Sequence, residues 1–217
     1  MIRGLIYDLI KIILLLILPF AILIRASTFI HVEYKWDSLT CLIGAAIITS
    51  ILMFIYFSFF YGKLTGRFGD FDALKRRALI AFLVVAVYSL HGILFFSSSN
   101  LKNPALKSEI NSLHPILRLG MSTLVYVDKK LIITDASREP EDYRKMGLPT
   151  KNASLHYKQK TSRYAHAVDI RTKGRGEWKN FLVKKYFELL GFNTLRHGGT
   201  ADHLHVSLKS HDFPGAR

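Results

Sequence analysis

The chain has 217 residues, a formal net charge of +14 and hydrophobic side chains at 50% of its positions. Its only cysteine is Cys41, so no internal disulfide can form in a domain that follows it. No RNA- or DNA-binding motif accompanies the positive charge, and we therefore expect no nucleic-acid partner. An anionic lipid or an anionic polymer is compatible with the same charge.

The composition changes near residue 97, because long apolar runs dominate the sequence up to that point. From Ser98 onward the chain is polar and carries 21 Lys and Arg against 11 Asp and Glu. Three apolar segments precede the change: Ile12–Ile24, which Leu5–Ile10 extends, then Ser38–Tyr61 and Ala78–Phe96. A helix needs about 20 apolar residues to cross the bilayer. The sequence therefore predicts three transmembrane helices, the first as an uncleaved signal anchor.

The loops between these segments predict how the chain is oriented in the membrane. Only Arg25 and Lys35 are basic between the first two segments, whereas the second and third are separated by Lys63, Arg67, Lys75, Arg76 and Arg77. Basic loops stay in the cytoplasm. We therefore expect a multi-pass protein of the cell membrane whose N-terminus is cytoplasmic and whose C-terminal domain is extracytoplasmic.

We divide the chain into a membrane domain at 1–97, a linker at 98–104 and a soluble domain at 105–217. Apolar spacing and turn residues predict the following elements. The first is a helix over Leu106–Leu117, broken at Pro115. Two strands joined by a turn follow at Thr123–Val127 and Leu131–Thr134, and then a loop over Asp135–Ala153 and a strand at Ala167–Ile170. A helix from Trp178 to Leu190, with its apolar side chains on one face, stops at Gly191, and the last two strands are Phe192–Leu195 and His203–Leu208. This order indicates an α+β fold with a small antiparallel sheet and flanking helices.

Six of the nine histidines lie between His156 and His211. His156 and Asp169 precede a closely spaced group, Asp202, His203 and His205. Two imidazoles and one carboxylate, with a fourth position left open, are typical of a catalytic zinc site, whereas structural zinc sites are usually rich in cysteine. In the last strand, a period of two places the histidines on one face and Leu204, Val206 and Leu208 on the buried face.

Four short motifs in order, SLHY, AVDI, LGF and HLHVSLK, resemble the zinc peptidases that cut bacterial peptidoglycan. These include D-alanyl-D-alanine carboxypeptidases and dipeptidases, murein endopeptidases and phage endolysins, and the Hedgehog signalling domain shares their fold. The resemblance spans Leu106–Lys209. It implies a Zn²⁺ ion on His156, Asp169 and His205, a general base at Asp202, and a role at the reaction centre for His203. It also implies substrate contacts from Arg138, in ITDASREPE, and from Ser154.

The sequence departs from this family between the first histidine and the aspartate. Twelve residues, Tyr157–Val168, stand where six are usual. The simplest interpretation is an insertion within Lys158–Tyr164 that forms a basic flap beside the site. Alternatively, His166 replaces His156 as a ligand.

The resemblance implies a membrane-anchored zinc peptidase, with a peptidoglycan peptide as substrate and the bilayer as its other partner. One rival is a non-catalytic zinc-containing recognition module, as the Hedgehog domain illustrates. Another is a lysis or toxin protein whose membrane helices do the damage. Neither the bond that is cut nor the oligomeric state is indicated by the sequence.

Overall fold

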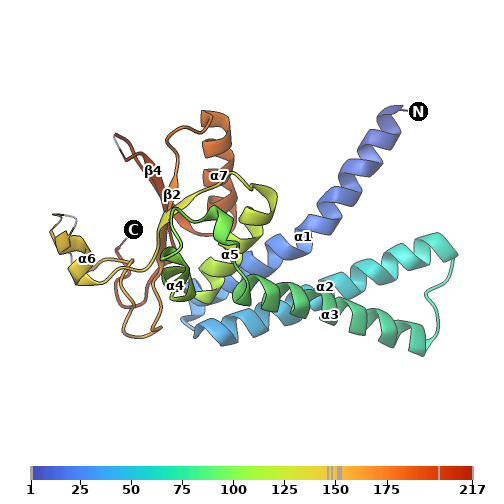
Figure 1. Ribbon diagram of the computed structural model, residues 1–217. Helices are drawn as coiled ribbons and strands as arrows, with labels where there is room; N and C mark the ends of the chain where they lie inside the picture. Colours follow the sequence, from blue (N-terminus) through green and yellow to red (C-terminus); the bar gives the residue numbers. More distant parts are fainter. Residues whose placement is uncertain (1, 146, 148, 151–152, 200, 217) are drawn as a thin grey trace.

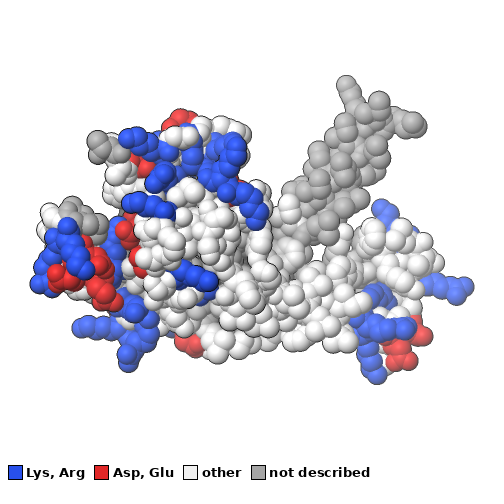
Figure 2. Space-filling model, viewed as in Figure 1, with Lys and Arg blue, Asp and Glu red and all other residues white. Residues whose placement is uncertain are grey.

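The computed structural model of the chain describes residues 2–145, 147, 149–150, 153–199 and 201–216, with residues 2–16 as backbone only. Three long helices come first: α1 (Ile2–Tyr34), α2 (Ser38–Thr65) and α3 (Phe71–Leu94) (Figure 1). The Asp37 carboxylate caps the start of α2 by accepting from the Leu39 and Thr40 amides. All three helices are apolar and long enough to cross a membrane, as predicted. In Figure 2, the middle parts of α2 and α3 lack the Lys and Arg that gather around the turn between these two helices.

Two shorter helices, α4 (Leu106–Asn111) and α5 (Pro115–Val127), join the long helices to the rest of the chain. Pro115 occupies the first turn of α5, where its missing N–H costs nothing, and this confirms the predicted break. The predicted strand at Thr123–Val127 is wrong, because these residues form the last turns of α5. Packing against α3 overrides their β propensity, since Gly92 of α3 lets α5 approach closely.

The sheet contains β1 (Ile133–Asp135), β2 (Ala167–Arg171), β3 (Asn193–His197) and β4 (His203–Ser207). Its order is β1-β2-β4-β3, and all neighbouring strands are antiparallel, which confirms the predicted α+β class. A short helix, α6 (Pro140–Lys145), lies within the predicted loop, so that prediction is wrong there. The residues predicted as a linker include a 3-10 turn, η1 (Ser98–Asn100), and the buried Asn100 amide donates to the Leu131 carbonyl.

Helix α7 (Glu177–Leu189) follows β2, and Gly191 stops it with a φ of +91°, as predicted. Val183 and Phe187 of α7 share one buried cluster with Ile170 and Val206 of the sheet. The apolar face that the sequence predicts for α7 packs only partly against the core. Of its members, Leu190 is buried and Tyr186 lies at the edge of the core. The other members of that face are exposed, namely Trp178, Phe181, Leu182 and Leu189.

The C-terminal turns of α1 belong to the same core as the sheet. Leu23 and Ile24 are fully buried, and Ile24 lies beside Gly120 of α5. His31 of α1 is buried, and its Nε2 lies 3.1 Å from the carbonyl oxygen of Lys209. The His31 ring also packs against the rings of His114, His166 and His211, with centroids 4.8, 5.8 and 4.3 Å away. This histidine cluster joins the first helix to the C-terminal segment of the chain.

The cluster predicts a pH dependence of stability. Burial, together with neighbouring His31 and His211, lowers the pKa of His166 from 6.5 to about 4. The unfolded chain binds a proton near pH 6.5 while folded His166 stays neutral. The free energy of unfolding should therefore decrease as the pH falls from about 6.5 towards about 4.

Replacing His166→Gln should flatten this slope, because the variant has no imidazole to protonate at position 166. Thermal melting of the full chain in detergent, recorded between pH 8 and pH 4, measures it, with the values at pH 8 as the internal reference. The prediction fails if variant and parent lose stability equally on acidification. Lys35, Lys209 and Asp212 also adjoin the cluster, so the comparison is made between variant and parent rather than with an absolute slope.

Candidate metal centre

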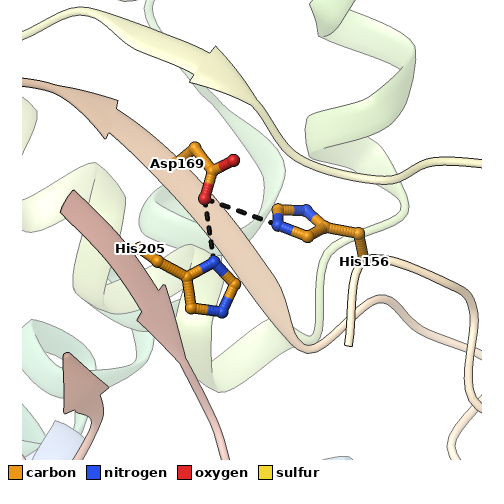
Figure 3. Close-up of side chains that lie close together, drawn as sticks. All are labelled: His156, Asp169 and His205. Carbon is orange, nitrogen blue, oxygen red and sulfur yellow. Dashed lines mark hydrogen bonds and ion pairs between the residues drawn. The ribbon is translucent and has the colours of Figure 1, made fainter. Parts of the chain in front are cut away.

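Three buried side chains meet on the face of the sheet opposite to α5 and α7 (Figure 3). Asp169 lies on β2, and His205 lies directly across from it on β4. His156 comes from the loop before β2. Among the residues that the structure describes, this is the only group of three metal-binding side chains whose ligand atoms all lie within 4.8 Å of one another. The three predicted metal ligands are thus brought together.

The distances fit one metal ion. His156 Nε2 lies 3.4 Å from Asp169 Oδ1, and His205 Nδ1 lies 2.9 Å from the same oxygen. Ligand atoms about 2.0–2.1 Å from a tetrahedral zinc ion are roughly 3.3 Å apart. The three atoms can therefore surround a single ion with small adjustments.

Hydrogen bonding leaves the right nitrogen of His156 available. Its Nδ1 donates to the Ala136 carbonyl, so Nε2, which faces Asp169, is the nitrogen left to bind an ion. A bond from the second ring nitrogen to a carbonyl is the usual support for a metal-binding histidine. The His205 ring is held differently, since its Nδ1 faces Asp169 and its buried Nε2 has no hydrogen-bond partner.

Asp169 is the electrostatic centre of the group. Burial alone would raise its pKa, but hydrogen bonds from His156 and His205 outweigh that effect and hold the pKa well below its usual value. Arg138 Nη2 lies 3.1 Å from the other carboxylate oxygen, Oδ2. The same guanidinium pairs with Asp135, at 2.7 Å and 2.8 Å. Arg138 therefore fixes the carboxylate so that Oδ1 points between the two imidazoles.

His166 does not join the group, so the alternative ligand set is not supported. It precedes Asp169 by three residues, which places it on the opposite face of the strand. Its Nε2 bonds to Ser162 Oγ at 2.8 Å, within the histidine cluster around His31.

The extra residues before β2 do not form the predicted flap. Residues 158–165 line neither hollow at the site. Instead, Gln159 accepts from Ser210 and Thr161 donates to Asp212. The segment is a compact turn fastened to the C-terminal part of the chain, because its polar side chains find partners there.

The two residues predicted to act on the substrate stand differently towards the site. His203 Nδ1 bonds to the Ala201 carbonyl, and its Nε2 lies 3.7 Å from Asp169 Oδ2. Asp202 forms a bidentate pair with Arg196, at 3.0 and 2.7 Å, and this hydrogen bonding lowers the pKa of Asp202 to about 2. In this conformation Arg196 occupies the Asp202 carboxylate, whereas His203 Nε2 lies near Asp169 at the cleft.

Two hollows meet at Asp169, Arg138 and His203. One, of about 640 Å³, extends over Ser154, Tyr143 and Leu195. The other, of about 460 Å³, is lined by Asp202 and by basic residues, namely Lys102, Arg171 and Lys173. Together they form a cleft that passes over the proposed metal position.

Ser154 and Arg138, the predicted substrate contacts, both line the cleft and also support the ligands. Ser154 Oγ lies 2.6 Å from the Tyr143 hydroxyl and accepts from the His156 amide. Tyr143 and Asp135 also belong to the site, although no sequence motif indicated either residue as a functional one. Asp135 ends β1 three residues before Arg138. This spacing of an acidic and a basic residue next to a strand was the feature of the sequence that could have indicated their ion pair.

We predict that the full chain, purified in detergent, binds one zinc ion per molecule. His156→Ala, Asp169→Ala and His205→Ala should each abolish stoichiometric binding, because two ligands do not hold the ion tightly. Elemental analysis after dialysis measures zinc content. His166→Gln is the matched control and should retain the metal. Full zinc in His156→Ala would show that the ligand set is wrong.

Comparisons with protein-family models, with curated proteins and with solved structures yield no match to this chain. What the site itself establishes is a buried His-Asp-His triad that can bind a metal ion, on a small antiparallel sheet that follows three apolar helices.

Proposed function

We propose that this protein is a membrane-anchored zinc hydrolase that cuts peptide bonds in the stem peptides of bacterial peptidoglycan. The observation that carries the proposal is the ligand geometry: three buried ligand atoms converge beneath an open cleft. Catalytic zinc sites have three protein ligands and one open position, whereas structural sites are closed.

When bound, the ion would polarise a carbonyl and make a coordinated water acidic enough to ionise near neutral pH. The protein must then accept and return one proton. His203 is suited to this step, because the bond to Ala201 leaves its Nε2 free towards the cleft. Protonated His203 would also stabilise negative charge that develops on the carbonyl oxygen.

Asp202 is the alternative base, as its position three residues before His205 suggests. Its carboxylate lies at the rim of the basic hollow but is held by Arg196, which Glu177 also binds. To accept a proton, it would have to leave a bidentate pair that favours its ionised form. We therefore assign proton transfer to His203 and the positioning of the β3–β4 turn to Asp202.

The lining of the cleft supports an anionic peptide as substrate. Lys102, Arg138, Arg171 and Lys173 surround the smaller hollow. Stem peptides carry free carboxylates, and guanidinium groups bind these with paired hydrogen bonds. The order of SLHY, AVDI, LGF and HLHVSLK along the chain supports the same substrate class, through the resemblance to peptidoglycan peptidases.

We predict that the full chain in detergent hydrolyses defined muropeptides in a zinc-dependent manner. His203→Gln should reduce turnover by about 10²–10⁴, the usual contribution of a positioned acid–base group. Asp202→Asn should reduce it much less, and both variants should retain zinc. Product masses identify the bond that is cut.

Each alternative outcome has its own meaning. A larger loss in Asp202→Asn than in His203→Gln would transfer the role of base to Asp202. A parent protein that holds zinc but leaves every muropeptide intact would contradict the hydrolase proposal and favour a recognition module. Cell lysis that persists in His156→Ala would favour a protein whose helices damage the membrane.

The proposed substrate requires the cleft to lie outside the cytoplasm. The five basic residues in the facing ends of α2 and α3 and in the turn that joins them favour that orientation. We predict that alkaline phosphatase fused after Arg217 is active, because this enzyme works outside the cytoplasm. Green fluorescent protein fused at the same position should be dark, because it fluoresces only in the cytoplasm. The same two reporters inserted after Arg67, between α2 and α3, serve as the reciprocal control. The opposite pattern would place the cleft in the cytoplasm and exclude peptidoglycan as its substrate.

A further inference from the structure

An apolar stripe on α7 faces away from the protein. Trp178, Phe181, Leu182 and Leu189 recur at helical spacing, and their exposed fractions are 69%, 46%, 48% and 75%. The Trp178 and Phe181 rings stack on each other, with centroids 5.4 Å apart. Isolated surface apolar residues are ordinary, but four large ones on one face of a helix are not, so the stripe indicates a partner.

The position of α7 indicates on which side that partner lies. Its opposite face, with Val183 and Phe187, packs on the sheet, so the stripe points away from the sheet. The same face of the sheet also meets α5, and α5 contacts all three long helices. The stripe is therefore on the side of the sheet where the long helices stand, and α7 runs across the direction of α2 and α3 (Figure 1).

Three contacts tie α7 to elements that continue into the long helices. At its N-terminal end, Arg175 pairs with Asp128, which caps α5. In its middle, the Tyr186 hydroxyl donates to the Gly120 carbonyl of α5 at 2.8 Å. Beyond its C-terminal end, Gly191 lies against Arg25 and Thr28 of α1.

The C-terminal turn of α5 continues the apolar surface of α3. The Tyr126 hydroxyl bonds to His91 of α3 at 2.7 Å, and the Val127 side chain beside it is 83% exposed. Tyr126 also lines an apolar hollow formed by outer turns of α3, including Val84 and Val87. The apolar surface of the spans thus extends through the end of α5, next to the point where Arg175 fastens α7.

We propose that α7 lies in the plane of the membrane, with its stripe in the interface of the leaflet from which the sheet domain emerges. Tryptophan and phenylalanine beside lysines are the composition of helices that lie in this layer. Lys179 and Lys184 flank the stripe, and Lys185 lies within it between Leu182 and Leu189. Lys184 and Lys185 also pair with Glu188, and long lysine side chains can reach from apolar surface to anionic headgroups. Figure 2 shows basic side chains gathered over this part of the molecule.

The arrangement fixes the direction in which the cleft opens. The metal ligands occupy the face of the sheet opposite to α5 and α7, so an α7 seated on lipid turns the cleft away from the bilayer. This inference does not depend on the reaction that the cleft performs, and hydrolase activity plays no part in its test.

The test uses the native fluorescence of Trp178. The chain has two tryptophans, and Trp36→Phe leaves Trp178 as the only reporter. The full-length variant is reconstituted in vesicles of phosphatidylcholine and phosphatidylglycerol whose acyl chains carry bromine at defined depths. We expect brominated lipid to quench Trp178, most strongly with the shallowest bromines, and acrylamide in the water to quench it weakly.

A matched control places the only tryptophan on α6, which carries no such stripe: Trp36→Phe, Trp178→Phe and Arg144→Trp in one chain, Arg144 being exposed. This reporter should be quenched by acrylamide and not by brominated lipid. Retained zinc and an unchanged circular dichroism spectrum confirm that both variants fold. Two results overturn the proposal: Trp178 quenched only by acrylamide, which places the stripe in water, and Trp178 hidden from both quenchers in a crosslinkable dimer, which assigns it to a second copy.

Discussion

The carboxylate of Asp169 is buried on an inner strand of the sheet, and a buried charge is tolerable only when it is paired and hydrogen-bonded. The residues around Asp169 provide this pairing and hydrogen bonding in different ways. Arg138 neutralises one oxygen from the β1 side, and His156 and His205 converge on the other. The ion pair Asp135–Arg138 and the Ala136 carbonyl hold those partners in place from the same short stretch of chain.

The site and its surroundings divide the sheet into two faces with different tasks. One face collects the charged and metal-binding groups beneath the cleft. The other carries Val168, Ile170, Leu204 and Val206 into a core that continues through α5 to Leu23 and Ile24 of α1. Because successive side chains of a strand point to opposite faces, one face of the four-strand sheet aligns the candidate metal ligands. The other face packs the sheet against the helices. The core behind the cleft is therefore continuous with packing in which α1 takes part.

Features set by local pattern were predictable from the sequence. Apolar length identified the three long helices, and alternation along His203–Ser207 placed His205 on the open face. Motif order identified the residues of the triad, although twelve residues rather than six separate His156 from Asp169. Features set by distant partners were not predictable. Thr123–Val127 has β-branched residues but is helical, because α3 packs against it. The apolar side chains of α7 recur at helical spacing, yet this periodicity alone does not reveal whether protein or solvent lies against them. The pairing of Asp202 with Arg196 depends on the register of β3 and β4, which no local pattern specifies.

The contact between His31 and Lys209 joins residues 178 positions apart in the chain. During synthesis, the contacts that hold the C-terminal end of α1 are therefore incomplete until the segment that follows β4 has left the ribosome. Until then the C-terminal end of α1 lacks the contact between His31 and the Lys209 carbonyl. A chain that stops before residue 209 lacks this contact, so the packing of α1 draws on residues made long after the helix itself.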